Sequence, residues 1–171
     1  QRRKVIETAG MKISLLKEKI EKNRDDLKHT LIYCTDKEPK QLEAVNELLK
    51  SLNIRFRQLT SEETSSKETT QKILHNFAQG TIEILTAKRV LDEGVNIPET
   101  QRAYVLASNT VERQWTQRRG RILRKCKEIG KTHAEIFDFV VLPPTLLNEI
   151  SKLTLDDKKL IELELKRLKE F

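Results

Sequence analysis

Short apolar runs alternate along this chain with segments whose apolar residues recur at helical spacing, and that alternation limits the possible folds more than any other feature. The apolar runs lie at residues 31–34, 82–86, 103–107 and 134–140, and a further strand is predicted at 54–58, where Ile54, Phe56 and Gln58 alternate with two arginines. Strands that alternate with helices over such lengths are typical of βαβ units and a parallel sheet. The sequence therefore predicts an α/β domain with a parallel sheet of about five or six strands flanked by helices.

The segments between the runs carry helix signals. Pro39 suits the first turn of a helix that continues to about residue 52. Ser65 with Glu68 fits a capping box that opens a further helix, and Gly80 is placed to end that helix. A first amphipathic helix is predicted within residues 1–27 from the apolar spacing of Ile13, Leu16, Ile20 and Leu27.

Pro143 and Pro144 mark a boundary near the end of the chain. Two amphipathic helices are predicted beyond it, with Thr154 and Asp157 as the cap between them, and packing against this domain or a neighbour is their simplest role. Three parts follow: an N-terminal helix at 1–30, an α/β domain at 31–142 and a C-terminal helical extension at 143–171. Because the chain begins at Gln1 without methionine, we expect it to be a fragment of a longer protein.

Charge and cysteine usage limit the class of protein. Lys and Arg number 33 against 26 Asp and Glu, a net charge of +7 that favours polyanionic partners, nucleic acid first. Cys34 and Cys126 lie far apart without CxxC spacing, which indicates a reducing, cytoplasmic environment and neither a disulfide framework nor a zinc site. No apolar run approaches the roughly 18–20 residues of a membrane span, so no membrane partner is expected.

The segment at residues 112–124, ERQWTQRRGRILR, concentrates arginines. A planar guanidinium suits bidentate binding of phosphate oxygens. On a helix Arg121 and Arg124 share one face, as do Gln117 and Arg121, so one face offers two guanidiniums and an amide to a single polyphosphate. A solvated basic helix or a general nucleic-acid patch is the alternative for such a cluster.

The position of this segment supports a binding role. In open parallel sheets, ligands bind at the carboxyl ends of the strands. Both the loop after Thr86 and the arginine segment follow a predicted strand, so we expect both at that rim of the sheet. Ser108 lies just past a strand as well, where its hydroxyl either reaches a phosphate oxygen or belongs to a helix cap.

Two other motifs are incomplete. Gly130, Lys131 and Thr132 end like a phosphate-binding P-loop, but Lys125 stands where the motif requires its first glycine, and a strand follows instead of a helix. We interpret these residues as a turn. Asp92 and Glu93 imitate a magnesium-binding pair without the unbroken apolar strand that should precede it, so no metal site is predicted.

Several ordered blocks resemble the second RecA-like domain of superfamily 2 helicases and translocases. LIYCTDKEPKQLEAV (31–45) resembles the motif IV region, FAQGTIEILTAKRVLDEGVNIPE (77–99) resembles motif V with its approach, and QRRGRILR (117–124) resembles motif VI. The LDEGVNIP form is most similar to the branch of DEAD/DEAH-like translocases that includes restriction-enzyme motor subunits. The resemblance covers about residues 10–140.

The resemblance implies a RecA-like fold and half of an ATPase site. ATP with Mg²⁺ binds between two such domains, and the N-terminal RecA-like domain of the same protein supplies the P-loop and the magnesium carboxylates. Arg121 and Arg124 are then the arginine fingers, the guanidiniums that stabilise the transferring phosphoryl group. The resemblance also implies Gln117, Gly94 and Asn96 for the nucleotide, and Lys88 or the backbone at Thr86 for the nucleic acid. Ser108 is added to the nucleic-acid candidates because of its position after a strand.

Two positions depart from the family pattern. Many members have aspartate at the position of Asn96, and threonine or serine near that of Lys88. An asparagine still bonds a ribose hydroxyl, and a lysine replaces a hydroxyl–phosphate bond by a direct charge contact. The departures leave the detailed chemistry open.

The implied function is the C-terminal motor domain of an ATP-dependent DNA or RNA helicase or translocase, with DNA favoured and this chain inactive by itself. The alternative is a non-catalytic nucleic-acid-binding module. A degenerate scaffold domain is a third possibility, against which the intact Gln117, Gly120, Arg121 and Arg124 argue.

Overall fold

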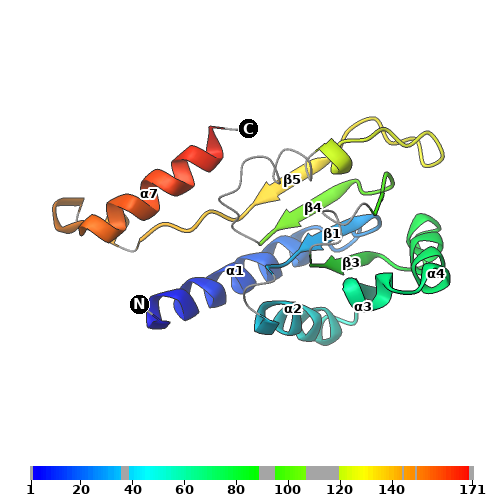
Figure 1. The fold of residues 1–171 in the computed structure, drawn as a ribbon, viewed down its shortest axis with the longest axis horizontal. Helices are drawn as coiled ribbons and strands as arrows, with labels where there is room; N and C mark the ends of the chain where they lie inside the picture. The colour runs from blue at the N-terminus through cyan, green and yellow to red at the C-terminus, as the bar shows by residue number, and fades with distance from the viewer. Residues whose placement is uncertain are drawn as a thin grey trace.

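The computed structural model describes residues 2–35, 39–88, 95–106, 120–143, 145–148 and 150–169. Its centre is a five-stranded sheet in the order β2-β3-β1-β4-β5, in which every neighbouring pair is parallel (Figure 1). This confirms the predicted α/β fold with a parallel sheet. The strands are β1 (Thr30–Tyr33), β2 (Phe56–Leu59), β3 (Ile84–Ala87), β4 (Arg102–Val105) and β5 (Glu135–Asp138).

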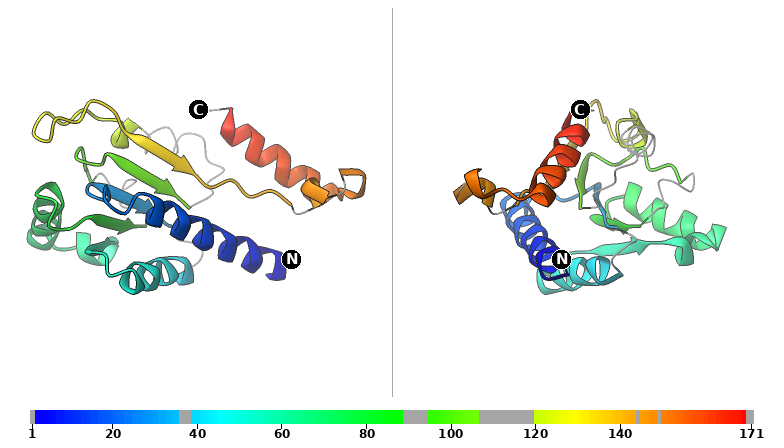
Figure 2. Two further views of the ribbon diagram at one scale, coloured as in Figure 1. Left: turned by 180° about the vertical axis from the view of Figure 1, so that it is seen from behind. Right: turned by 60° about the vertical axis from the view of Figure 1, so that its left-hand side comes forward.

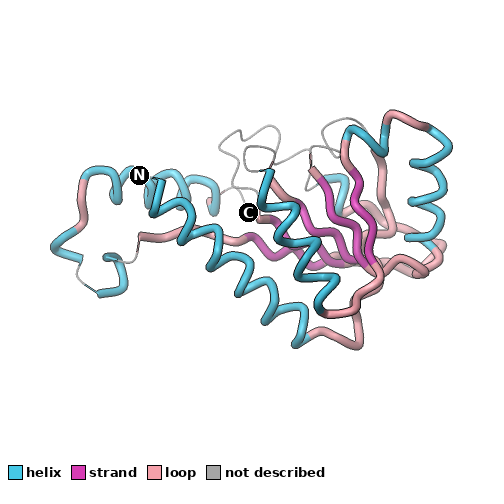
Figure 3. Tube along the Cα trace, turned by 90° about the horizontal axis from the view of Figure 1, so that it is seen from below, coloured by secondary structure: helices cyan, strands magenta, loops and turns pink. Residues whose placement is uncertain are grey.

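Helices cover both faces of the sheet (Figures 2 and 3). α1 (Arg2–Lys22) and α2 (Pro39–Ser51) pack on one face, where Leu16 and Leu49 contact the core. α4 (Lys67–Ala78) packs on the other face through Phe77, after the short α3 (Ser61–Thr64). α1 therefore belongs to the core of the α/β unit and is more than a leading segment.

The central strands carry mostly apolar residues because both of their faces are buried. Ile84 of β3 joins the cluster under α1 and α2, whereas its neighbour Leu85 joins the cluster under α4. Both side chains are fully buried. A strand covered on two sides reads as a continuous apolar run and not as an alternating one, which is why the sequence signal for β1 and β3 is so compact.

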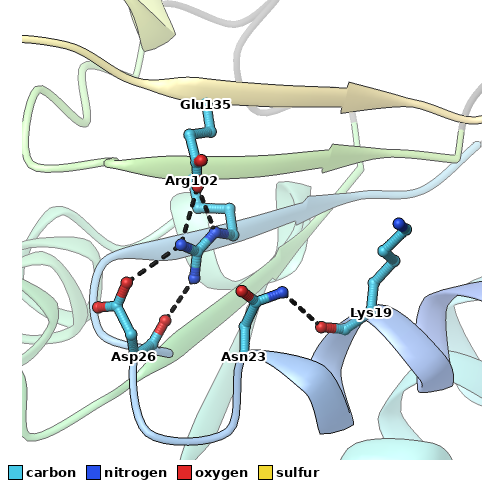
Figure 4. Close-up of polar contacts among 5 residues, drawn as sticks. All are labelled: Lys19, Asn23, Asp26, Arg102 and Glu135. Atoms are coloured by element: carbon cyan, nitrogen blue, oxygen red, sulfur yellow. Dashed lines mark hydrogen bonds and ion pairs between the residues drawn. The ribbon is translucent and has the colours of Figure 1, made fainter.

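The amino ends of β4 and β5 are joined by a buried arginine (Figure 4). Arg102, 9% exposed, donates from Nη2 to Glu135 Oε2 at 2.8 Å and to Asp26 Oδ2 at 3.1 Å. Its Nη1 also donates to the backbone carbonyl of Asp26. Burial opposes the charge of Arg102, but the hydrogen bonds that it donates to its two acidic partners outweigh burial, so the pKa of Arg102 is raised. The guanidinium thus fixes the end of the sheet at which the strands begin.

The helix caps differ in position from the prediction. The capping box is formed by Thr60 and Glu63 at α3, and α4 begins one residue later than expected, with Ser66 as its N-cap. Ser65 instead ends α3. Ser65 and Ser66 are both suitable N-cap residues, and Glu63 and Glu68 are both suitable partners in a capping box. Tertiary packing, and not the local sequence pattern, therefore decides which of them form the caps. Gly80 follows the end of α4 with φ +71°, which confirms its predicted role.

Glu63 predicts a pH-dependent contribution to stability. Burial alone raises the pKa of Glu63, but hydrogen bonds from Thr60 and Gln58 outweigh it, so the pKa is lowered. A lowered folded-state pKa stabilises the fold above the unfolded pKa of about 4.3, and this contribution is lost as pH falls through the folded pKa. We expect Glu63→Gln to cost about 1 kcal/mol at neutral pH and to make the loss of stability in acid shallower.

The measurement is the urea midpoint of unfolding at a series of pH values. Glu62→Gln is the matched control, because Glu62 is an exposed carboxylate on the same turn. Parallel pH profiles for wild type and Glu63→Gln would contradict the assignment.

The C-terminal part differs from the two predicted helices. A short α6 (Thr145–Asn148) and a 3₁₀ turn, η1 (Ile150–Lys152), replace the first, and α7 (Leu155–Leu168) is the second. Thr154 and Asp157 bond reciprocally at the start of α7, as predicted, with Thr154 N to Asp157 Oδ2 at 3.1 Å. α7 lies beyond the carboxyl end of β5 (Figures 1 and 2). Within the described ranges, no helix is both long and apolar enough to cross a membrane.

Candidate nucleotide and nucleic-acid site

Five of the eight predicted site residues lie in the described part of the chain. The other three are outside it, so their predicted roles stay predictions. The described residues are Thr86, Lys88, Asn96, Arg121 and Arg124, and those outside are Gly94, Ser108 and Gln117.

The structure brings Arg124 and Asn96 into contact, although 28 residues separate them in sequence. Nη1 of Arg124 donates to Oδ1 of Asn96 at 2.5 Å, and both side chains are exposed. An amide is neutral, so this bond orients the guanidinium without cancelling its charge. Asn96 thus directs the planar guanidinium of Arg124, which is still able to bind an anion.

Two buried isoleucines hold this pair in place. Ile97 follows Asn96 directly, and Ile122 lies two residues before Arg124. Each is 2% exposed, and both belong to the core cluster on the α4 face of the sheet. Ile97 and Ile122 fix the backbone positions from which the side chains of the neighbouring polar residues reach the surface. The pairing of Asn96 with Arg124 therefore follows from core packing.

Arg124 lies away from the rim at which the arginine segment was expected. The carbonyl of Ile122 accepts from Lys131, which lies just before β5, and the turn of helix at 120–122 lies beside the start of that strand (Figure 1). The prediction of a carboxyl-end position is therefore wrong for Arg121 and Arg124. The reason is topological: a connection between parallel strands must return along the whole sheet, and these arginines come late in it.

Thr86 is part of the core and not of a surface. Its side chain is fully buried in β3, and its Oγ1 donates to Asn46 Oδ1 at 2.9 Å. Asn46 in turn donates to Gln58, and Gln58 donates to Glu63 at 2.7 Å. Thr86 thus begins a hydrogen-bonded chain that ties β3 to α2, β2 and the capping box. Its hydroxyl is used inside the fold, and the structure does not support a contact between this side chain and nucleic acid.

Lys88 lies at the opposite end of the sheet from Arg124. It follows β3 directly, where the N–H of Cys34 donates to the carbonyl of Ala87 at 2.8 Å. Burial raises the pKa of the Cys34 thiol to about 12, and the nearby positive charge of Lys88 acts in the other direction. The half-buried Lys88 therefore does occupy the carboxyl rim, as predicted.

Arg121 is half-buried, at the start of the same helical turn as Ile122. It is less exposed than Arg124, so the two candidate fingers are not equivalent in this structure. Arg124 is the more exposed residue of the two.

A residue to which the sequence assigned no role connects both site segments. Lys131 is 5% exposed, and its Nζ donates to the carbonyl of Pro98 at 2.9 Å and to that of Ile122 at 2.6 Å. The predicted turn is present, since Gly130 has φ +66°. The position of Lys131 in an incomplete P-loop motif could not by itself show that its ammonium group points inward.

The positive charge of the described site suits phosphate. Within the described part of the chain, no group of three His, Cys, Asp or Glu side chains is placed to hold a metal. Arg124 and Lys88 supply cationic donors, which bind phosphate oxygens. The arrangement can therefore bind the anionic part of a nucleotide or of a nucleic-acid backbone.

The family is decided by comparison with known protein families. The model described as "Helicase conserved C-terminal domain" matches residues 11–126, which includes the segments of Lys88, Asn96 and Arg124. The chain belongs to this family. The match starts within α1, in agreement with the packing of that helix into the core. This confirms the resemblance to superfamily 2 helicases and translocases.

Individual proteins agree with this assignment. The chain is 39% identical over 61 residues to the DNA 3'-5' translocase XPB2 of Sulfurisphaera tokodaii, a match that covers 36% of this chain and 14% of that protein. Its fold is similar to the C-terminal part of the Fun30 ATPase domain, with a TM-score of 0.64, 18% identity, and 91% and 52% of the two chains covered.

A second similar structure is the fragment of a putative HsdR subunit of a type I restriction enzyme from Vibrio vulnificus YJ016. Its TM-score is 0.60 at 23% identity, with 81% of this chain and 28% of that chain covered. Since this chain spans only a small part of XPB2 and about half of the Fun30 structure, it corresponds to one portion of such proteins.

Proposed function

We propose that this chain is the C-terminal motor domain of an ATP-dependent nucleic-acid translocase or helicase. ATP with Mg²⁺ is bound mainly by an N-terminal RecA-like domain of the same protein. Arg124, assisted by Arg121, reaches the transferring phosphoryl group of that nucleotide. Lys88, with Ser108, contacts the nucleic-acid backbone, and DNA is favoured because XPB2, to which the chain is 39% identical over 61 residues, is named a DNA translocase.

The contact between Arg124 and Asn96 is the observation that carries the proposal. It joins the motif V and motif VI segments, and it leaves the positive charge of Arg124 exposed. A phosphoryl group in transfer spreads negative charge over its equatorial oxygens, and a positioned guanidinium stabilises that charge. Asn96 supplies the positioning, and its amide is also suited to a ribose hydroxyl.

The separation of Lys88 from Arg124 supports two distinct contacts. The two residues lie toward opposite ends of the sheet, so one surface can meet nucleotide while another meets the nucleic-acid backbone. Closure of the two domains on ATP inserts Arg124, and release of phosphate after hydrolysis removes the charge that attracts it. Each cycle of closing and opening then shifts the backbone contact along the strand.

Because the chain has no P-loop, we expect the isolated 171 residues to show no ATP turnover above background, whereas the full-length protein turns over ATP with nucleic acid present. The measurement is phosphate release at equal molar concentrations of the two proteins. Robust turnover by the isolated chain would overturn the half-site assignment.

The alternative, a non-catalytic nucleic-acid-binding module, is favoured by the net charge of +7. In that case the arginines meet only phosphodiester groups. Binding of DNA by the chain would then weaken steeply with salt, and each lost phosphate contact would reduce the logarithmic slope by about 0.9 for duplex DNA. Arg124→Ala would lower that slope and leave ATP turnover of the full-length protein unchanged.

A further inference from the structure

Lys131 is a buried lysine that the proposed mechanism does not use. It lies in a tight turn, in which its N–H donates to the carbonyl of Cys126 at 2.8 Å and Gly130 adopts a positive φ. Burial lowers the pKa of Lys131. A buried ammonium is costly unless hydrogen bonds compensate it, so its contacts indicate why it is there.

The ammonium bonds two backbone carbonyls from different segments. Pro98 lies two residues after Asn96, and Ile122 lies two residues before Arg124. Their carbonyls accept from Lys131 Nζ at 2.9 and 2.6 Å. A helix leaves its last carbonyls without partners in the helix, and a cation near that end is favourable. Lys131 satisfies such a carbonyl at Ile122 and simultaneously holds the loop at Pro98.

The same two segments are therefore joined twice. Beneath the surface, Lys131 joins their backbones; at the surface, Arg124 joins their side chains through Asn96. A single exposed hydrogen bond between flexible side chains contributes little by itself and costs side-chain entropy, so the orientation that Asn96 gives Arg124 depends on how firmly the two backbones are held. The buried connection keeps both backbones at the separation that the surface contact needs.

We propose that Lys131 is a positioning residue for the candidate nucleotide site, which clamps the loop carrying Asn96 to the segment carrying Arg124. The inference rests on the proposed function, because the orientation of Arg124 matters for turnover only if Arg124 meets ATP. Lys131 itself contacts no nucleotide. Its effect on the reaction passes through the placement of the guanidinium.

The test compares Lys131→Met with wild type in the full-length protein, since methionine keeps much of the side-chain volume and removes the donors. Hydrogen–deuterium exchange is expected to rise about 10-fold or more in residues 95–101 and 120–126 and to stay unchanged in β1 and β3. With nucleic acid present, kcat for ATP is expected to fall about 10- to 100-fold. KM is expected to change less than about 3-fold.

Lys127→Met is the matched control. Lys127 is an exposed lysine of the same turn, so this variant removes the same charge without touching either carbonyl, and both exchange and kcat are expected to stay at wild-type values. Lys131→Arg, which keeps a charged group with several donors, is expected to recover part of the lost kcat. The inference would be overturned if Lys131→Met left hydrogen–deuterium exchange unchanged and Lys131→Arg recovered none of the lost kcat.

The remaining outcomes separate the inference from the proposed function. Arg124→Ala is measured in parallel: if it leaves kcat unchanged, the proposed function fails whatever Lys131 does. If Arg124→Ala lowers kcat and Lys131→Met does not, the inference alone fails. Uniformly faster exchange across the whole sheet also overturns it. Should Lys131→Met not be recovered folded, Lys131→Gln takes its place, with selective exchange supporting the clamp and uniform exchange excluding it.

Discussion

Arg124→Ala in the full-length protein is expected to lower kcat for ATP by about 10³-fold, which corresponds to roughly 4 kcal/mol of transition-state stabilisation. The guanidinium meets charge that develops mainly in the transition state, so KM for ATP is expected to change little. Arg124→Lys is expected to recover only a small part of the loss, because a lysine is a point charge without the planar fork.

The measurement is steady-state ATP turnover with saturating nucleic acid. Lys125→Ala is the charge-matched control, because Lys125 is an exposed cation directly after Arg124. Asn96→Ala is expected to give a smaller loss than Arg124→Ala, since it releases the guanidinium without removing it. Equal, mild losses from Arg124→Ala and Lys125→Ala would instead indicate a general basic patch.

Ile122→Ala is expected to cost about 2–4 kcal/mol of unfolding free energy, whereas Leu123→Ala, one residue later, is expected to cost less than about 0.5 kcal/mol. Ile122 is 2% exposed and belongs to the core cluster on the α4 face, whereas Leu123 is 48% exposed. Truncating a buried isoleucine removes apolar burial and leaves a cavity, but truncating an exposed leucine does neither.

The measurement is urea unfolding of the 171-residue chain. Ile122 and Leu123 are adjacent, so the comparison is well controlled. Both variants shorten an apolar side chain near the end of the same helical turn. A small effect of Ile122→Ala would show that the arginine segment is not anchored in the core. The predicted site geometry would then lose its physical basis.

The fold class could be predicted from the sequence because buried positions are occupied by apolar residue types. The runs at residues 31–34 and 82–86 became β1 and β3, displaced by only one or two residues, since strands buried on both faces need uninterrupted apolar side chains. Gly80 was also predictable, because few residues other than glycine adopt a positive φ readily. The helix caps were less predictable, because Thr60, Ser65 and Ser66 are all suitable N-cap residues.

The chemistry of the site was only partly predictable. The density of arginines and the motif spacing singled out Arg121 and Arg124, because guanidiniums in that pattern suit phosphate whatever the fold. The burial of Thr86 could not be foreseen, since a threonine in a strand reads equally as a surface hydroxyl and as a core hydrogen-bond donor. Only packing against Asn46 distinguishes the two.

The sequence by itself determined that this chain is a parallel α/β domain with an arginine-rich segment, because composition and periodicity are local properties. The tertiary structure decided which residues meet. Asn96, Arg124 and Lys131 come from three separate segments, and a contact between distant segments depends on how the crossover after β4 returns across the sheet. Ile97 and Ile122, which lie close to Asn96 and Arg124 in sequence, pack in one core cluster, and no local pattern encodes that packing.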